Sequence, residues 1–312
     1  MRKQTFLAAL LSVLLAFSGC RPLVEDAPKN LTVYATFYPI YALVEALTGD
    51  VPDLTLHCLV QPQDGCLRDY ALSDWDLSLL SSADAVFAGG RGLESFESTL
   101  FGFGEKGPAV SALLYILELE GTAPANHVEA EQESHLAGPN PHLYMSVEGA
   151  EEIIESAAAM LQTLDPGYAQ SYIDHETKAF EALGSLSAQA KAIAGDLKGQ
   201  RVILMNEALI YVARDYGLEI AGQFDRESGE ALFDRDLDAC LEQLSQYGAN
   251  VVLIERQAPK ALVDALRDSG YSVGLIDILS THREAEGFDG YIQAQFNNAR
   301  AIRRAFDGEE NH

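Results

Sequence analysis

The stretch that decides the fold is "RVILMNEALIYVARDYGLEIAGQF", residues 201–224. Its first six residues, 201–206, are mostly apolar and predict a β-strand. The following "EALIYVARDYG" is typical of a helix that ends at Gly217, and "EIAGQF" predicts a second strand. Strands that alternate with helices at this spacing indicate a parallel sheet, because the helix carries the chain back across the sheet.

The same alternation continues on both sides of this stretch. Further strands are predicted at 31–37, 54–60, 84–90, 250–255 and 272–277. Helices are predicted from Pro39 to Gly49 and at 73–83, 149–163, 234–248 and 290–306, with Ser73 as an N-cap. We therefore expect an α/β fold made of two β/α lobes.

A long helical segment, residues 168–199, separates the two series. It has no proline and could reach about 45 Å if it is unbroken, at 1.5 Å per residue. One apolar stripe is expected along it, made of Ile173, Phe180, Leu183 and Leu186. The predicted organisation is an N-terminal lobe at 31–165, a linking helix at 166–199 and a C-terminal lobe at 200–312.

The first residues indicate the compartment. "MRKQTFLAALLSVLLAFSGC" has a basic start, a short apolar run and two small residues before Cys20, which is the layout of a secretory signal. A cysteine at this place is typical of a bacterial lipoprotein, so we expect a signal peptide at 1–19, lipid attachment at Cys20 and a polar tether at 20–30. The alternative is an ordinary signal peptide that a cysteine happens to follow. The expected location is the extracytoplasmic surface, with the protein anchored to the bacterial membrane.

The composition excludes other classes of protein. The chain of 312 residues is 48% apolar and 22% charged, which is typical of a folded globular protein. Its formal net charge of −26 argues against nucleic acid as a partner, because phosphate binding needs clustered Lys and Arg. We found no GxSxG, no HExxH and no phosphate-binding glycine loop, so an enzyme is not expected. We expect a monomer.

Four segments are expected at the rims where parallel sheets bind ligands, beyond the carboxyl ends of the strands. They are "QDGCLRDY" at 63–70, "NPHLY" at 140–144, "MNEA" at 205–208 and "LIDIL" at 275–279. Two lobes that face each other would gather their polar side chains in one cleft. These side chains are Cys66, Arg68, Asp69, His142, Asn206, Glu207 and Asp277.

Several motifs resemble one family. "TFYPIYALVEALTGD" is similar to its opening strand and helix, and "SSADAVFAGGRGLESF" to its pattern ADxVFxNGxGLExW. "NPHLYMS" resembles xPHxWxD, "MNEALIYVARDYGL" resembles xHxAFxYxxxxYGL, and "GYIQAQFNNARAI" resembles its last helix. The family is that of the bacterial ABC-transporter solute-binding lipoproteins that deliver zinc or manganese, and the resemblance covers nearly the whole mature chain.

The resemblance implies two lobes, each with a parallel four-stranded sheet, joined by one long rigid helix. It also implies a Zn²⁺ or Mn²⁺ ion as cargo between the lobes, and an ABC permease and its ATPase as partners. Of the family's four usual metal ligands, His142 and Asp277 are retained. Arg68 stands at the place of the first histidine and Asn206 at that of the third. Arginine stays protonated and cannot bind a metal, whereas asparagine offers only a neutral amide oxygen.

Three hypotheses follow from these replacements. In the first, the site is rebuilt from His142, Asp277, Glu207 and Cys66, while Arg68 turns away or pairs with Asp69. In the second, Arg68 pairs with Asp277 and the cleft binds an anionic or zwitterionic solute. In the third, the scaffold has lost its ligand and acts as a surface interaction protein or adhesin.

Simpler interpretations stand beside these roles. Glu207 is also typical of an acid in the first turn of a helix, and Asp277 of a residue that caps a turn. Cys58 and Cys66 could form a disulfide or stay reduced. His127 and His135 lie in the polar segment 120–141 and could collect metal, whereas His57, His175 and His282 are typical of surface or packing residues.

Overall fold

The computed structural model describes residues 30–61, 67, 70–103, 107–112, 140–224, 237–280, 282 and 284–309. The chain divides into two units, Met1–Asn30 and Leu31–His312, and the second contains both sheets and all the helices named below. No helix among the described residues is both long enough and apolar enough to cross a membrane. The signal peptide, Cys20 and the tether lie outside these residues and stay predictions, as do the domain boundaries.

The first sheet is parallel throughout. Its strands are β1 (Leu31–Ala35), β2 (Leu54–Cys58), β3 (Ala85–Ala88) and β4 (Ala109–Ala112), in the spatial order β2-β1-β3-β4. Its helices are α2 (Tyr38–Thr48), α3 (Asp74–Ser82), α4 (Glu97–Gly102) and α5 (Val147–Leu164), with the short turn η4 (Leu143–Met145) before α5. Ser73 caps α3 as expected, because its hydroxyl accepts from Asp76 N and the Asp76 carboxylate accepts from Ser73 N.

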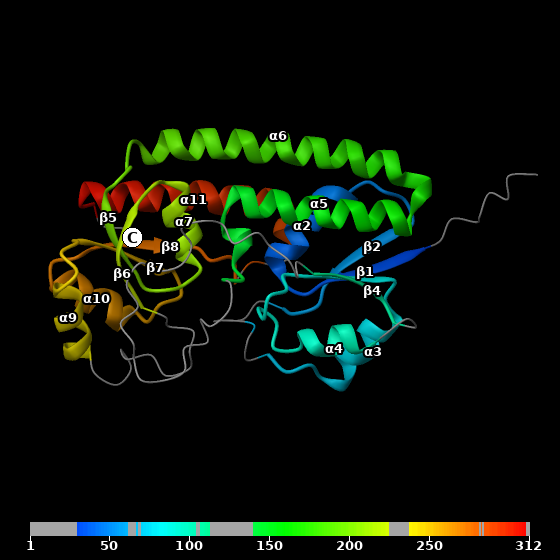
Figure 1. Ribbon diagram of the computed structural model, residues 1–312, viewed down its shortest axis with the longest axis horizontal. Coiled ribbons are helices and arrows are strands. Elements are labelled where there is room, and N and C mark those ends of the chain that lie inside the picture. The colour runs from blue at the N-terminus through cyan, green and yellow to red at the C-terminus, as the bar shows by residue number, and fades with distance from the viewer. Residues whose placement is uncertain are drawn as a thin grey trace, which may run out of the picture. The chain divides into compact units, whose positions relative to one another are not determined.

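The second sheet repeats this plan. Its strands are β5 (Arg201–Leu204), β6 (Glu219–Gln223), β7 (Val251–Glu255) and β8 (Ser272–Ile276), all parallel, in the order β6-β5-β7-β8. The helices are α7 (Leu209–Asp215), α9 (Leu237–Ser245), α10 (Lys260–Asp268) and α11 (Gly287–Asp307), and the turn η6 (Glu284–Glu286) precedes α11. In Figure 1, β1, β2 and β4 lie together on one side of the molecule, and β5 to β8 lie together on the other side. The predicted fold class is confirmed.

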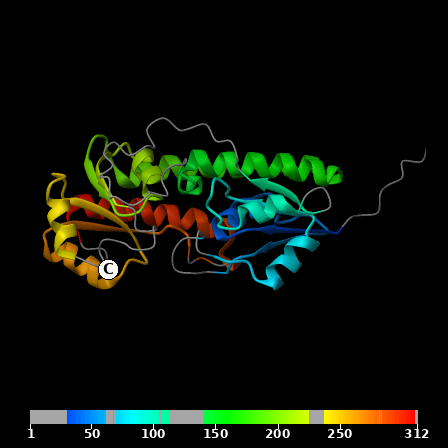
Figure 2. The ribbon, with the colours of Figure 1, turned by 60° about the horizontal axis from the view of Figure 1, so that its bottom comes forward.

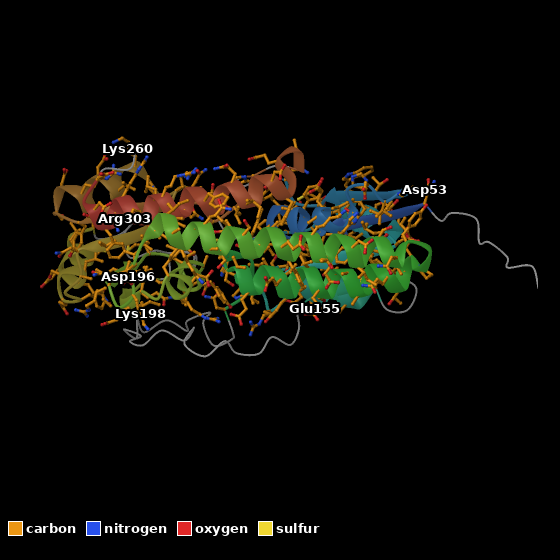
Figure 3. The ribbon with its side chains drawn as sticks, turned by 90° about the horizontal axis from the view of Figure 1, so that it is seen from above. Asp53, Glu155, Asp196, Lys198, Lys260 and Arg303 are labelled. Atoms are coloured by element: carbon orange, nitrogen blue, oxygen red, sulfur yellow. The ribbon has the colours of Figure 1, made fainter. Side chains whose placement is uncertain are left out.

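The helix α6 (Ala169–Ala194) joins the two series after the short turn η5 (Pro166–Tyr168). It ends at Gly195, whose φ of 77° is the left-handed conformation that favours glycine, so it is shorter than the predicted 168–199. Its buried side chains are Tyr172, Ala179, Leu183, Leu186, Ala190 and Ala194. The predicted stripe was wrong at Ile173, which is 40% exposed, because the neighbouring Tyr172 takes the inward position. Figure 3 shows α6 between α11 and α5, and it packs against both.

A second helix, α11, also contacts elements of the first sheet. The Tyr38 hydroxyl donates to Gly287 O (2.9 Å), and the Glu45 carboxylate accepts from Phe288 N (3.1 Å). From there α11 packs along β8, and Figure 2 shows this red helix running from the blue α2 toward the orange strands. One hydrophobic core includes residues of both sheets, such as Val33 and Leu204. Two helices and a shared core therefore connect the two lobes.

The carboxyl ends of the second sheet lie level with one another. Leu204 is paired with Leu253, and just beyond it Met205 N donates to Leu253 O (2.9 Å). Arg256 N donates to Ile276 O (2.8 Å) in the same way. The segments that follow β5, β7 and β8 thus leave the sheet at the same edge, where the sequence predicted binding residues.

Candidate metal-binding site

His142 is placed by the turn that precedes α5. It lies after Asn140 and Pro141, at the start of η4, and it is buried with 1% of its surface exposed. Asn140 Oδ1 accepts from the backbone N–H of His142 (3.0 Å) and also lies 3.0 Å from Nδ1 of its ring. An amide oxygen accepts from Nδ1–H, which leaves the lone pair on Nε2 for a ligand.

Glu207 lies in the turn between β5 and α7. Its backbone carbonyl accepts from Asn140 Nδ2 (2.8 Å), and its side chain is fully buried. The interpretation of Glu207 as an acid in the first turn of a helix was wrong, since α7 begins only at Leu209. Its carboxylate is therefore a candidate oxygen donor for a metal ion, because carboxylate oxygen is a common ligand of zinc.

The turn also fixes Asn206. Its Oδ1 accepts from Ala208 N (2.9 Å), which is the local contact of an Asx turn. The amide oxygen that the sequence offered to a metal therefore holds the turn that carries Glu207.

His142 and Glu207 are the one predicted pair that the described residues place in direct contact. Glu207 Oε1 lies 3.6 Å from His142 Nδ1. Asn140 holds both partners, and its own carbonyl accepts from the Tyr211 hydroxyl (2.7 Å). Glu207 therefore faces the Nδ1 side of the His142 ring, which Asn140 also contacts, while Nε2 lies on the other side of the ring.

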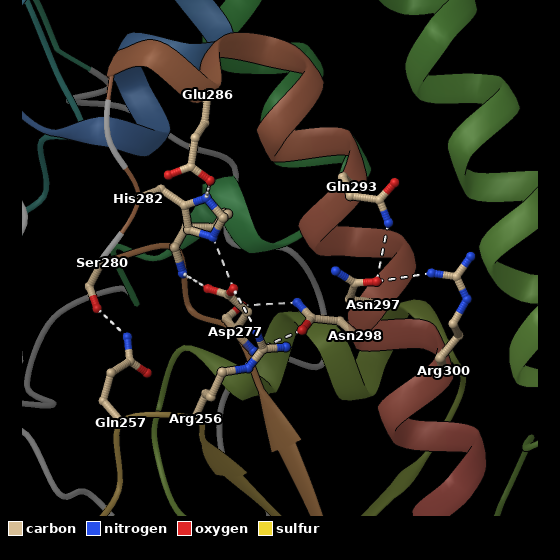
Figure 4. A network of polar contacts seen from close by, with 11 residues as sticks. Arg256, Gln257, Asp277, Ser280, His282, Glu286, Gln293, Asn297, Asn298 and Arg300 are labelled. Atoms are coloured by element: carbon tan, nitrogen blue, oxygen red, sulfur yellow. Dashed lines mark hydrogen bonds and ion pairs between the residues drawn. The ribbon is translucent and has the colours of Figure 1, made fainter. Parts of the chain in front are cut away.

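Asp277 is the centre of a second group, which Figure 4 shows. Its backbone N–H and C=O are both paired with the Asn298 amide of α11, at 2.8 and 2.9 Å. Its Oδ1 accepts from Leu279 N (2.8 Å), so the turn-capping interpretation is confirmed. Leu279 has a φ of 68°, a strained value for a residue other than glycine that this hydrogen bond helps to hold.

The other oxygen of Asp277 faces two cations. Its Oδ2 lies 2.9 Å from His282 Nε2 and 3.5 Å from Arg256 Nη1. Burial raises the pKa of Asp277, but the hydrogen bond and charge of His282, the Leu279 N–H and Arg256 outweigh it and hold the pKa below its usual value. The hydrogen bond to Asp277 raises the pKa of His282, which burial opposes and Glu286 supports. The carboxylate of Asp277 is therefore kept ionised.

The remaining predicted residues lie outside the described part of the chain. They are Cys66, Arg68, Asp69, His127 and His135, so their roles stay predictions. Cys58 is buried, and its thiol donates to Val60 O (3.3 Å); the disulfide with Cys66 stays a prediction because Cys66 is not described. Cys240 is buried in a second hydrophobic cluster, together with Ile203 and Val252.

Asn140, Arg256 and His282 were not predicted from the sequence as members of the site. His282 was interpreted as a surface or packing residue; it does pack, and it also lies between Asp277 and Glu286. Its ring stacks on Tyr38, with centroids 4.9 Å apart. No periodicity or spacing in "DILSTH" signals this role, because Tyr38 belongs to α2 at the other end of the chain.

The donors on this edge are one or two imidazoles and two carboxylates, a set that suits zinc and the harder manganese ion. Within the described residues, no group of three or more His, Cys, Asp and Glu side chains is already placed to hold a metal. The pairs His142–Glu207 and Asp277–His282 are thus two parts of a candidate site.

The sequence matches one family along most of its length. This is the family described as "ZnuA: Zinc-uptake complex component A periplasmic", and residues 33–305 match it. The chain belongs to the ZnuA family. This family is one of uptake components rather than of enzymes, and it is the solute-binding family to which the motifs pointed.

The proteins that this chain resembles are distant from it in sequence. The zinc-binding lipoprotein AdcA of Streptococcus pneumoniae is 22% identical over 296 residues, which cover 91% of this chain and 58% of the relative. The manganese-bound solute-binding protein FpvC of Pseudomonas aeruginosa is 22% identical with a TM-score of 0.72, over 89% of this chain and 99% of FpvC. A mutant of the laminin-binding adhesin Lmb of Streptococcus agalactiae is 17% identical with a TM-score of 0.66, over 88% of this chain and 99% of Lmb.

These likenesses have a clear limit. The chain spans about three fifths of the length of the curated relatives it matches. At these identities the solved structures confirm the ZnuA-type fold, with two parallel sheets and a long helix, and nothing more.

Proposed function

We propose that this protein is the solute-binding component of an ABC importer, and that it captures a divalent metal ion, zinc or manganese, for delivery to a membrane permease. The metal is cargo rather than a resident cofactor. Membership of the ZnuA family and the names of the relatives support this proposal. We further propose that a lipid on Cys20 holds the protein on the outer face of a bacterial membrane, and that it has no catalytic activity.

The observation that carries the proposal is the buried pair of His142 and Glu207. Both side chains are almost completely removed from water, and their nearest ring nitrogen and carboxylate oxygen are 3.6 Å apart. A metal ion bound by two such buried donors would offset the cost of removing them from water. The His142 ring already directs Nδ1 toward Asn140, an arrangement that commonly orients a metal-binding histidine.

Asp277 supplies the second donor group in this proposal. Its carboxylate stays ionised, and its backbone is fixed on both sides by Asn298. Donors that are held before the ion arrives lose little freedom when it binds, which favours tight binding. The helices α6 and α11, which both contact α2, would then permit only a small closing movement around the ion.

A titration tests the proposal directly. The full chain, purified in detergent and freed of metal by chelation, is titrated with Zn²⁺ and Mn²⁺ by calorimetry. We expect one ion per chain, and a fall in affinity of at least about 100-fold in His142→Ala and in Asp277→Ala. The matched control is His57→Ala, because His57 lies on β2 against Tyr34 and should not affect binding.

The result also decides between the alternatives. Two results would contradict metal capture. One is that the protein binds neither ion tightly, and the other is that His142→Ala and Asp277→Ala bind the ion as tightly as the unchanged protein. Binding of an anionic or zwitterionic solute in its place would favour the hypothesis in which Arg68 neutralises Asp277. Binding of neither would favour a surface interaction protein, the role that the name of Lmb suggests for that relative.

A further inference from the structure

Asp277 and His282 are hydrogen-bonded to each other, and this brings a carboxylate oxygen and an imidazole nitrogen almost to the spacing of two ligands of one metal ion. Asp277 Oδ2 and His282 Nε2 are 2.9 Å apart. Zinc binds carboxylate oxygen and imidazole nitrogen at about 2.0–2.2 Å with tetrahedral angles, so two such ligands lie about 3.4 Å from each other. To bind one ion together, the two atoms must separate by about 0.5 Å, and the imidazole must give up the proton of their hydrogen bond.

The opposite side of the His282 ring is already occupied. Glu286 Oε2 lies 2.8 Å from Nδ1, and Tyr38 stacks on the ring at 4.9 Å with an interplanar angle of 21°. A carboxylate on one ring nitrogen, with the other nitrogen directed at the ion, is the usual arrangement around metal-binding histidines. Figure 4 shows His282 between Glu286 and Asp277, so its Nε2 points toward the oxygen that a metal would use.

We propose that His282 is a metal ligand in this protein, and that it supplies an imidazole which the sequence lacks at Arg68 and Asn206. The inference rests on the proposed function, and it adds a named ligand to it. Asp277 and His282 bind the ion from the segment after β8, while His142 and Glu207 contribute from η4 and the turn after β5. Arg256, whose side chain is half exposed, withdraws to water when the ion takes Asp277 Oδ2.

A second histidine shows why burial matters to this assignment. His175 Nε2 lies 2.9 Å from Asp50 Oδ1, which is the same spacing, and His175 is exposed to nearly the same small extent as His282. The Asp50 side chain, however, is 80% exposed, and His175 Nδ1 contacts the carbonyl of Leu47. Water already solvates that carboxylate, whereas Asp277 is buried at a strand end, where a metal ion could take the place of the proton on His282 and of Arg256. The His175–Asp50 pair is therefore a matched control.

The test uses variants of the full chain loaded with zinc. His282→Gln removes the ligating nitrogen but keeps a polar side chain of similar reach, and we expect its affinity for Zn²⁺ to fall by at least about 100-fold. His282→Glu places a carboxylate oxygen at the same reach and should recover most of that loss. His175→Gln should bind within about twofold of the unchanged protein. X-ray absorption of the loaded protein should show two imidazoles, and one fewer in His282→Glu.

Each outcome has a distinct meaning. If His282→Gln binds zinc within about threefold of the unchanged protein, or if His282→Glu shows the same number of imidazoles, His282 is not a ligand, while metal capture itself stands. If the unchanged protein binds no metal, the proposed function and this inference both fall. Thermal unfolding of each variant without metal separates loss of a ligand from loss of folding, and a His282→Glu variant that folds but does not recover binding also overturns the inference.

Discussion

Asp215 should weaken the fold at neutral pH, and its replacement by asparagine should stabilise the protein. Asp215 is the last residue of α7, and its Oδ2 accepts a long hydrogen bond from Val147 N (3.4 Å) at the start of α5. Burial raises the pKa of Asp215 to about 6, although the Val147 N–H, Lys191 and Arg214 act in the opposite direction. Glu148 adds to the increase.

The sign of the effect follows from proton binding. In the unfolded chain the carboxyl has a pKa near 3.8. Between pH 3.8 and about pH 6, the folded state therefore holds a proton that the unfolded state has released. Stability therefore falls as pH rises through this window. At about 1.4 kcal/mol per pH unit, the full loss above pH 7 is about 3 kcal/mol. An asparagine side chain carries no charge to bury, so Asp215→Asn should recover about 2 to 3 kcal/mol at pH 7.5.

Urea unfolding at two pH values measures this effect. The free energy of unfolding of Asp215→Asn should exceed that of the unchanged protein at pH 7.5, and the two should agree within about 1 kcal/mol at pH 4, where the folded state of both carries a neutral side chain. The control is Asp174→Asn, because Asp174 is exposed on α6, where its carboxylate accepts a hydrogen bond from Gln170. That variant should match the unchanged protein at both pH values.

One result would refute the reasoning. If Asp215→Asn changes stability by the same amount at pH 4 and at pH 7.5, the effect comes from packing or hydrogen bonding rather than from the buried charge. A loss of stability at pH 7.5 would show that Lys191 and Arg214 outweigh burial.

Three further predictions concern the site and the helices. Arg68→His should increase Zn²⁺ affinity at least about tenfold in a calorimetric titration, because it removes a cation and adds an imidazole. Asn140→Ala should lower metal affinity by about 10- to 100-fold in the same titration, since this residue contacts His142 and Glu207 without being a ligand. Gly149→Ala should lower the free energy of unfolding by about 1–3 kcal/mol, because a Cβ there would lie 2.3 Å from a backbone oxygen. Gly184→Ala is its control: the added Cβ meets nothing within 4 Å, so this variant should raise the free energy of unfolding by about 0.5–1 kcal/mol.

The sequence predicted the parts of the fold that have a strong local signal. Long apolar strands between helices indicated both sheets, and the region without proline indicated α6. The helix α4 was not predicted, because six residues are too few to show a helical period, and the strand β4 was not predicted either. Ile173 was assigned to the buried stripe because it is apolar, whereas the side on which α6 packs is decided by α5, α2 and α11.

The site was predictable only where a motif carried it. His142 and Asp277 were identified from motif positions, and the structure places both among buried polar contacts. The role of Glu207 was undecided, because the local sequence is compatible both with an exposed acid on a helix and with a buried acid in a turn. The contact that separates these cases comes from Asn140, which is 67 positions away in the chain.

His282 shows how a site can change without losing its chemistry. Two usual histidine positions hold Arg68 and Asn206, which alone would suggest that metal binding is lost. A site needs donors at the right spacing, however, and not at fixed positions of a motif. The ring of His282 owes its orientation to Tyr38 from α2 and to Glu286 from the turn before α11. These contacts exist only once α11 has packed against α2, so tertiary structure rather than local sequence decides whether this histidine can bind a metal.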